Sequence, residues 1–121
     1  MGDSIAAGVR ATAAASGWLI LPADLPLISP DTLRSIAFAA PCAVTLPVYQ
    51  GQRGHPVRFG RECAADLLNL QGNQGAAQLV KAREATNSVA MIEVDDIGCV
   101  TDVDTLDDLA RAEKLLANRT V

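Results

Sequence analysis

Aromatic side chains are scarce in this sequence, with only four among its 121 residues: Trp18, Phe38, Tyr49 and Phe59. Half of the residues are nevertheless hydrophobic, and alanine is abundant. A chain of this length can bury about two thirds of its unfolded surface, so it needs neither disulfides nor a structural metal to fold. The composition indicates one domain in which helices pack closely on a sheet of aliphatic strands.

Cysteine and positive charge are also sparse. The three cysteines, Cys42, Cys63 and Cys99, include no C-x-x-C pair, which disfavours a disulfide framework or a zinc site and favours the cytoplasm. We expect each of them to act as a small buried hydrophobe. The net charge of −4 argues against a nucleic-acid partner, because that affinity comes from Lys and Arg. No apolar run approaches the ~20 residues of a membrane span, so we expect no membrane partner.

Apolar patterns and turn signals alternate along the chain. We expect helices over 4–15, 29–40, 61–70, 76–84 and 105–118, and strands over 18–22, 42–49, 57–59 and 88–96. Ser29 is a candidate N-cap with Pro30 at the first helical position, and Thr105 with Asp108 forms a candidate capping box. This alternation favours an α/β domain with a mainly parallel sheet and helices on both faces.

The first candidate for chemistry is Asp24, in the segment LPADLPL. Pro22 and Pro26 hold the residues before them extended, so the position of the carboxylate is well defined. Asp24 follows a strand and precedes a helix, and α/β sheets bind ligands outside the carboxyl ends of their strands. Mg²⁺ takes oxygen ligands and often only one or two protein carboxylates, which suits this position. The alternative is a solvated turn aspartate without a ligand.

A second acidic segment, VTDVDTLDDL, precedes the last expected helix. Asp102 and Asp104 are two residues apart and point the same way if the segment is extended. A metal site between Asp24 at one strand end and Asp102 or Asp104 at another is geometrically reasonable. The alternative is that Asp104 and Asp107 favour the helix N-terminus through its dipole. For Asp102 both interpretations stay open.

The turn GQRGHPVRFGR gathers Arg53, Arg58, Arg61 and the only histidine, His55. A glycine-rich turn with these side chains can bind an anion, and a solvated hairpin is the alternative. The sequence contains no Walker A loop, no G-x-G-x-x-G and no G-x-S-x-G that would point to other chemistry.

Four segments that follow one another in order are more specific than any of them alone: residues 17–33, 47–60, 67–80 and 92–112. They resemble the molybdenum cofactor cytidylyltransferase branch of the MobA-like NTP transferases, over essentially the whole chain. The resemblance implies a Rossmann-like, three-layer fold and a Mg²⁺-dependent transfer of CMP, or another NMP, from an NTP to molybdopterin. CTP is the favoured nucleotide, GTP stays open, and a molybdoenzyme is a candidate partner.

The resemblance also assigns roles to residues of this chain. Asp24, in the P-A-D-x-P motif, corresponds to a metal-binding catalytic aspartate, and Asp102 to a second one with Asp104 nearby. The contacts to nucleotide and acceptor fall to Ser4, Gly54, His55 and Pro56.

Family members open with a strand and a loop like L-A-A-G-x-S-x-R-M-G, whereas residues 1–4 resemble an internal loop. We therefore expect residues 1–121 to be the C-terminal portion of an N-terminally truncated family domain. An apolar strand left at the sheet edge invites pairing with a second copy, so a homodimer is a further hypothesis. Two alternatives to the enzyme stay open. One is an inactive remnant that serves as a cofactor-binding or accessory domain, and the other is a sugar-nucleotide glycosyltransferase that uses Asp102 and Asp104 as a D-x-D motif.

Overall fold

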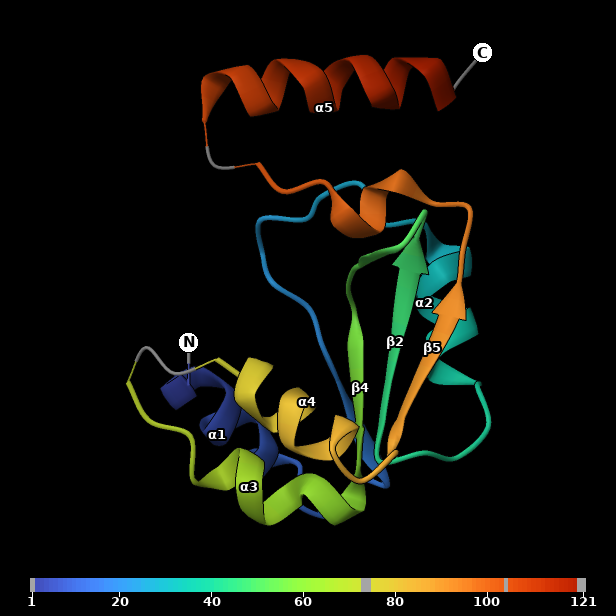
Figure 1. Ribbon diagram of the computed structural model, residues 1–121. Helices are drawn as coiled ribbons and strands as arrows, with labels where there is room; N and C mark the ends of the chain where they lie inside the picture. The colour runs from blue at the N-terminus through green and yellow to red at the C-terminus, as the bar shows by residue number, and fades with distance from the viewer. Residues whose placement is uncertain (1, 73–74, 104, 120–121) are drawn as a thin grey trace.

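Helices and strands alternate along the chain in the computed structural model, which describes residues 2–72, 75–103 and 105–119 (Figure 1). The helices are α1 (Gly2–Ala11), α2 (Pro30–Ala37), α3 (Ala64–Leu68), α4 (Ala77–Glu84) and α5 (Leu106–Arg119). The strands are β1 (Gly17–Ile20), β2 (Val44–Tyr49), β3 (Gln52–Arg53), β4 (Val57–Gly60) and β5 (Val89–Glu93). The segments η1 (Arg61–Cys63) and η2 (Ile97–Val100) are 3₁₀ turns. The α/β class predicted from the sequence is confirmed.

The strands form one sheet in the order β1-β4-β2-β3, with β5 also paired to β2. β2 and β5 are parallel, whereas β4 is antiparallel to both β1 and β2, and β3 is antiparallel to β2. The expectation of a mainly parallel sheet is therefore wrong for the strand pairs in the described part of the chain. The reason is the tight turn at Gln50 and Gly51, both with positive φ, which reverses the chain and brings β4 back between β1 and β2. As a result, β1, β2 and β5 share one direction and β4 opposes it.

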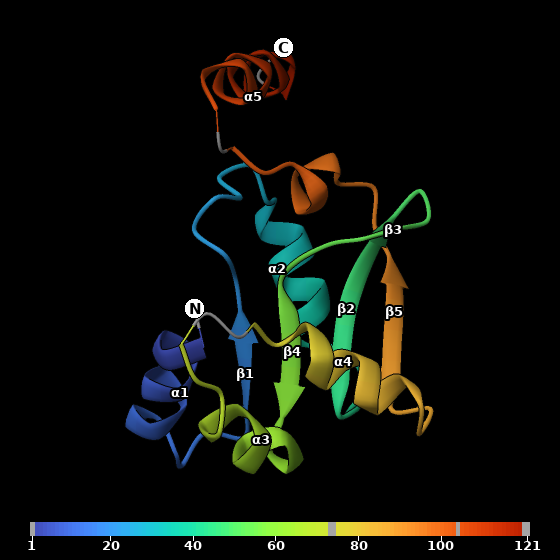
Figure 2. The same cartoon turned by 60° about the vertical axis from the view of Figure 1, so that its left-hand side comes forward.

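Helices lie on both faces of the sheet, as the predicted three-layer arrangement requires. α2 covers one face, and α1, α3 and α4 lie on the other (Figures 1 and 2). β2 is buried on both faces, which its continuous apolar run predicts. Val44 and Leu46 of this strand pack with Phe59, Leu67 and Val80 in the main core, because alternate side chains of a strand point to opposite faces.

Local sequence signals set the start of α2. The side-chain oxygen of Ser29 accepts a hydrogen bond from the N–H of Asp31 at 3.2 Å, and Pro30 is the first helical residue. The predicted N-cap is thus confirmed. The helix ends at Ala37, three residues earlier than expected, and the helix expected over 61–70 divides into η1 and α3.

α5 stands apart from the sheet (Figures 1 and 2). The N–H of Asp108 donates to Oγ1 of Thr105 at 3.1 Å, which confirms the Thr105 half of the predicted capping box. Ala112 is buried, whereas Leu106, with 84% of its surface accessible, and Leu116 are exposed. Among the described helices, none has the length and apolar character that crossing a membrane requires.

Candidate active site

The carboxyl ends of β1, β2 and β5 lie at one edge of the sheet, because these strands share a direction. β4 runs the opposite way, so it begins at that same edge, directly after Pro56. The loops 21–29, 54–56 and 94–103 therefore meet there (Figure 1). Ligands of α/β sheets bind at such an edge, and Asp24, His55 and Asp102 all lie in these loops.

A pocket of about 550 Å³ opens at this edge. The side chains that matter for its chemistry are Asp24, Gln52, Arg53, His55, Cys99 and Asp102. The structure thus brings together the two aspartates that the sequence predicts at separate strand ends. The pocket combines their negative charge with the positive charge of Arg53.

A main-chain hydrogen bond joins the two acidic loops. The N–H of Val103 donates to the carbonyl oxygen of Asp24 at 2.8 Å. Because Val103 follows Asp102 directly, this bond holds the backbone of Asp102 beside that of Asp24. Asp24 is half-buried and Asp102 is exposed. Their convergence is a finding of the structure, and their roles as metal ligands stay predictions.

His55 lines the same pocket. Its main-chain N–H donates to the carbonyl oxygen of Cys99 at 2.9 Å, whereas its Nδ1 is buried without a hydrogen-bond partner in the described part of the chain. Burial lowers the pKa of His55, and the negative charge of Asp24 opposes this shift in part. The neutral imidazole is therefore favoured, and its Nδ1 makes no hydrogen bond to any residue that the structure describes. A buried polar atom without a partner calls for an explanation, and a ligand supplies one.

Gly54 and Pro56 position His55 and are not among the pocket-lining residues. The N–H of Gly54 donates to the carbonyl oxygen of Pro47 at 2.9 Å. A Cβ atom at Gly54 would lie 2.5 Å from the carbonyl oxygen of Cys99 and 2.6 Å from its Sγ. Pro56 is fully buried, and the bond between His55 and Pro56 is cis. Packing accounts for both residues, and their assigned cofactor contacts stay predictions.

Asp96, which was not predicted from the sequence, supports the loops around the pocket without lining it. Only 6% of its surface is accessible, and its Oδ2 accepts hydrogen bonds from Oγ1 of Thr32 at 2.7 Å and from the N–H of Ser29 at 2.9 Å. Its Oδ1 accepts from the N–H of Gly98 at 3.0 Å. These bonds tie η2, which carries Cys99, to the start of α2. The sequence signal that could have pointed to Asp96 is an acidic residue shortly after the apolar strand β5 and directly before η2.

Two of the predicted site residues are not placed with the others. Ser4 is exposed on α1, which packs against α3 (Figure 2). Ser4 does not line the pocket. Its assigned contact with the nucleotide stays a prediction. Asp104 lies outside the described residues.

The positive charges of the glycine-rich turn separate in the structure. Arg53 lines the pocket and pairs with Glu84 of α4. Arg58 instead donates to main-chain carbonyl oxygens that end and follow α2. Arg61 donates to the carbonyl oxygens of Ala13 and Ala15, both at 2.7 Å. The predicted anion-binding turn is thus reduced to Arg53 and His55.

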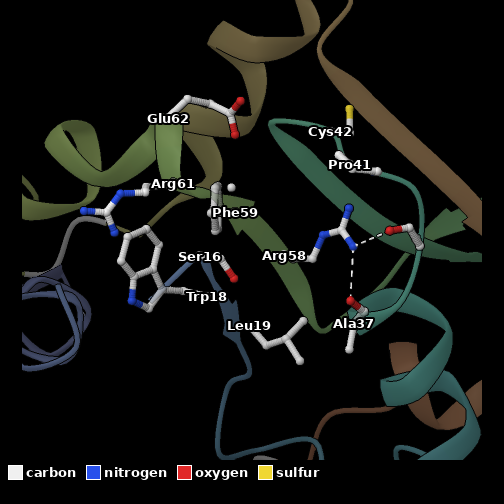
Figure 3. A pocket seen from close by; sticks show the side chains of 13 residues that line it. Ser16, Trp18, Leu19, Ala37, Pro41, Cys42, Arg58, Phe59, Arg61 and Glu62 are labelled. Carbon is white, nitrogen blue, oxygen red and sulfur yellow. Dashed lines mark hydrogen bonds between the residues drawn. The ribbon is translucent and has the colours of Figure 1, made fainter. Parts of the chain in front are cut away.

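A larger cleft, of about 640 Å³, lies beside the start of β1 and the end of β4 (Figure 3). Its guanidinium groups belong to Arg58 and Arg61, which are already bonded to main-chain carbonyl groups, as Figure 3 shows for Arg58 and Ala37. We therefore place the candidate active site in the smaller pocket, where charged side chains from separate loops converge.

The acidic pair of the smaller pocket suits a hard divalent cation. Asp24 and Asp102 offer carboxylate oxygens, and Mg²⁺ is commonly held by one or two protein carboxylates together with substrate phosphates. Among the described residues, no group of three or more His, Cys, Asp or Glu could hold a metal ion. Asp24 and Asp102 are the carboxylate side chains that line the pocket, and a cation held between them stays a prediction.

Comparison with known proteins gives the relatives of the chain. The family model of the MobA-like NTP transferase domain matches residues 1–88, which include Asp24 and His55, whereas Asp102 lies beyond the match. The purine catabolism protein PucB of Bacillus subtilis (strain 168) is 32% identical over 106 residues, which cover 86% of this chain and 51% of PucB. The chain thus spans about half the length of this relative.

Solved structures share the fold. Rv0371c from Mycobacterium tuberculosis H37Rv in complex with manganese matches with a TM-score of 0.67 at 30% identity, over 85% of this chain and 57% of that chain. Molybdopterin-guanine dinucleotide biosynthesis protein A from Archaeoglobus fulgidus matches with a TM-score of 0.63 at 17% identity, over 98% of this chain and 63% of that chain. The family match over most of the chain and the shared fold lead to one conclusion: the chain belongs to the MobA-like NTP transferase domain family.

Proposed function

We propose that the chain binds an NTP together with Mg²⁺ between Asp24 and Asp102 and takes part in transferring NMP to a molybdopterin-type acceptor. The observation that carries this proposal is the placement of both carboxylates in one pocket, with their loops joined by the bond from Val103 to Asp24. Membership of the MobA-like family supports a nucleotidyl transfer, and the manganese complex of Rv0371c supports a divalent metal.

In this proposal, the chain contributes position and charge and supplies no side-chain nucleophile. Asp24 and Asp102 hold the cation, which when bound neutralises charge on the triphosphate and orients it. A phosphate oxygen of the acceptor forms a bond to the α-phosphorus as the bond to pyrophosphate breaks. Arg53 offers N–H donors to phosphate oxygens, and the neutral ring of His55 faces the acceptor without adding positive charge.

The test is a calorimetric titration with CTP, with and without Mg²⁺. We expect Mg²⁺-dependent binding by the wild type and its loss in Asp24→Ala and in Asp102→Ala. Asp95→Asn is the matched control, because Asp95 is an exposed carboxylate near the same edge that does not line the pocket. Equal binding by the wild type and Asp24→Ala would remove the proposed role of Asp24.

The proposal also concerns which nucleobase the chain prefers and whether the chain turns over its substrate. The resemblance favours CTP, and competition with GTP in the same titration decides between them. Release of pyrophosphate in the presence of molybdopterin separates an active transferase from a domain that binds its ligands without turnover. The glycosyltransferase alternative rests on a D-x-D motif whose Asp104 lies outside the described residues, and tighter binding of a UDP-sugar than of CTP would favour it.

Self-association is a further part of this proposal. β1 lies at the edge of the sheet, and Leu19 and Leu21 each expose 43% of their surface there. An unpaired edge strand is a template for another strand, which supports the predicted homodimer. Sedimentation that shows a monomer at every concentration would contradict it. The cytoplasmic location and the molybdoenzyme partner stay predictions from the sequence.

A further inference from the structure

Arg53 places a positive charge in a pocket that also holds Asp24 and Asp102. Its guanidinium group makes two hydrogen bonds to Glu84 of α4, from Nη1 to Oε1 and from Nη2 to Oε2, the second at 2.7 Å. The same bonds lower the pKa of Glu84, so its carboxylate is ionised. Glu84 itself is not among the residues that line the pocket. A residue outside the pocket therefore sets the orientation of a charged group inside it.

The Arg53–Glu84 pair is exposed, with 46% and 33% of the two side chains accessible. Exposed ion pairs contribute little to stability, because solvent and salt screen them. A two-bond arginine–carboxylate pair does, however, fix the plane of the guanidinium group. The consequence of this contact is thus geometric more than energetic.

The pairing leaves much of the guanidinium group available. An arginine side chain carries five N–H donors, and the bonds to Glu84 use one on each terminal nitrogen. Nε–H and the remaining hydrogens of Nη1 and Nη2 lie in the same plane. Such planar donors match the oxygen atoms of a phosphate group, which a lysine would bind only as a point charge.

The main chain of Arg53 is held as firmly as its side chain. Arg53 pairs with Val48 in the β2–β3 ladder, and the N–H of the next residue, Gly54, donates to the carbonyl oxygen of Pro47 at 2.9 Å. β2 thus fixes the backbone, and α4 fixes the guanidinium group through Glu84. Little conformational freedom remains to be lost when a ligand binds.

We propose that Arg53 binds a phosphate group of the substrate, and that Glu84 is a positioning residue that holds its guanidinium plane ready. This inference rests on the proposed function, because the phosphate belongs either to the NTP or to the acceptor.

The charge of Glu84 allows a sharp test. By charge alone, Glu84→Gln removes a negative group near the pocket and strengthens the binding of an anion. By positioning, the same change weakens binding, because the long side chain of Arg53 must then be ordered when the anion binds. The two explanations therefore predict changes of opposite sign.

The experiment titrates the purified chain by calorimetry at ~0.15 M salt, an ionic strength that screens exposed charges, in the presence of EDTA. Tripolyphosphate is the probe for the NTP, and inorganic phosphate is the probe for a phosphate monoester of the acceptor. We expect about tenfold weaker binding by Arg53→Gln, since a charge-assisted hydrogen bond is lost. Arg53→Lys keeps the positive charge but loses the planar set of N–H donors. We therefore expect its affinity for the anion to lie between those of the wild type and Arg53→Gln. For Glu84→Gln we expect binding about threefold weaker, from the ordering cost of one arginine side chain.

Asp31→Asn is the matched control, because Asp31 forms an exposed ion pair with Arg34 on α2. It should leave both affinities unchanged, and all variants should melt at nearly the same temperature. A larger loss of tripolyphosphate affinity in Arg53→Gln assigns Arg53 to the nucleotide, and a larger loss of phosphate affinity assigns it to the acceptor. Unchanged or tighter binding by Glu84→Gln overturns the positioning role, and a wild type that binds neither anion overturns the whole inference. Because this titration contains EDTA and no metal, its outcome is independent of the Mg²⁺-dependent CTP titration. Failure of the proposed function and failure of this inference can therefore be distinguished.

Discussion

The hydroxyl group of Thr32 donates a hydrogen bond of 2.7 Å to Oδ2 of Asp96, and so joins the start of α2 to the loop after β5. The N–H groups of Ser29 and Gly98 also donate to this buried carboxylate. Because η2 begins one residue later, the contact fixes Cys99 and the loop that leads to Asp102 against α2. The geometry of the pocket therefore depends on a residue that does not line it.

Asp96→Asn tests this dependence. Asparagine keeps the shape of the side chain, but its amide group puts a donor where the carboxylate has an acceptor, facing other donors. We therefore expect the free energy of unfolding, measured in urea, to fall by about 1–3 kcal/mol. Asp31→Asn is the control, because Asp31 is exposed on α2, and its effect should stay within about 0.5 kcal/mol. If the two variants unfold alike, Asp96 does not hold the loop.

Gly54→Ala tests the close approach of the His55 loop to η2. A Cβ atom at Gly54 would meet the main-chain carbonyl oxygen of Cys99 at 2.5 Å, and that oxygen cannot rotate away. We expect a loss of about 1–3 kcal/mol in the free energy of unfolding, as for other overpacked sites.

Gly8→Ala is the matched control for Gly54→Ala. Gly8 lies within α1, and a Cβ atom added there would meet no neighbouring atom within 4 Å, so the change should be neutral or stabilise by up to about 1 kcal/mol. Chemical denaturation of both variants measures the difference. A Gly54→Ala protein as stable as the wild type would show that the two loops are not in contact.

Local signals explain which parts of the fold could be predicted from the sequence. Ser29 and Pro30 mark the start of α2, and the apolar run of β2 marks a strand covered on both faces. Because strand ends at one edge of a sheet collect ligands, the position of Asp24 after an apolar strand made a site shared with Asp102 or Asp104 a reasonable hypothesis, and the structure places Asp24 and Asp102 in one pocket. These inferences need only the neighbours of each residue along the chain.

Partners distant in the sequence explain what could not be predicted. The residues Gln50 and Gly51 signal a turn, but the turn does not say that β4 inserts between β1 and β2 and makes most pairs antiparallel. Arg53, Arg58 and Arg61 lie within one short stretch, yet their acceptors are Glu84, the carbonyl groups after α2 and those after α1. Asp96 likewise accepts hydrogen bonds from Ser29 and Thr32, more than 60 residues away at the start of α2. Which acceptor each side chain reaches depends on the tertiary fold, and no local pattern records it.

His55 gives a prediction for pH, because it is the only histidine in the chain and its ring resonance in NMR is unambiguous. Burial lowers its pKa below the ordinary value of 6.5, and Asp24 partly opposes this. We expect the ring to titrate below 6.5 in the wild type and lower still in Asp24→Asn, where the opposing charge is removed. Titration at or above 6.5 would show that the ring is not buried as described.

The same shift makes stability depend on pH. A folded-state pKa below the unfolded one means that the unfolded chain binds the proton more readily, so stability rises with pH between the two values. The contribution of His55 is fully present above pH 6.5 and is lost as the pH falls through its folded-state pKa. We expect the wild type to lose more stability than His55→Gln between pH 7 and pH 5, when both are unfolded in urea at each pH.

Arg58→Lys tests whether the side chain of Arg58 caps the carboxyl end of α2 by bonding to its free carbonyl groups. Arg58 donates to the main-chain oxygens of Ile36, Ala37, Ala39 and Ala40 and to Oγ1 of Thr45, at 2.7–3.3 Å. Lysine keeps the charge but carries only three donors on a single nitrogen, so it leaves several of these acceptors without a partner. We expect a loss of about 2 kcal/mol in the free energy of unfolding, since unsatisfied polar groups are costly.

Arg10→Lys is the control for Arg58→Lys. It lies at an exposed site on α1 and should change the free energy of unfolding by less than about 0.5 kcal/mol. Equal stability of the two variants would mean that charge alone, and not the forked geometry of the guanidinium group, holds α2 against the sheet.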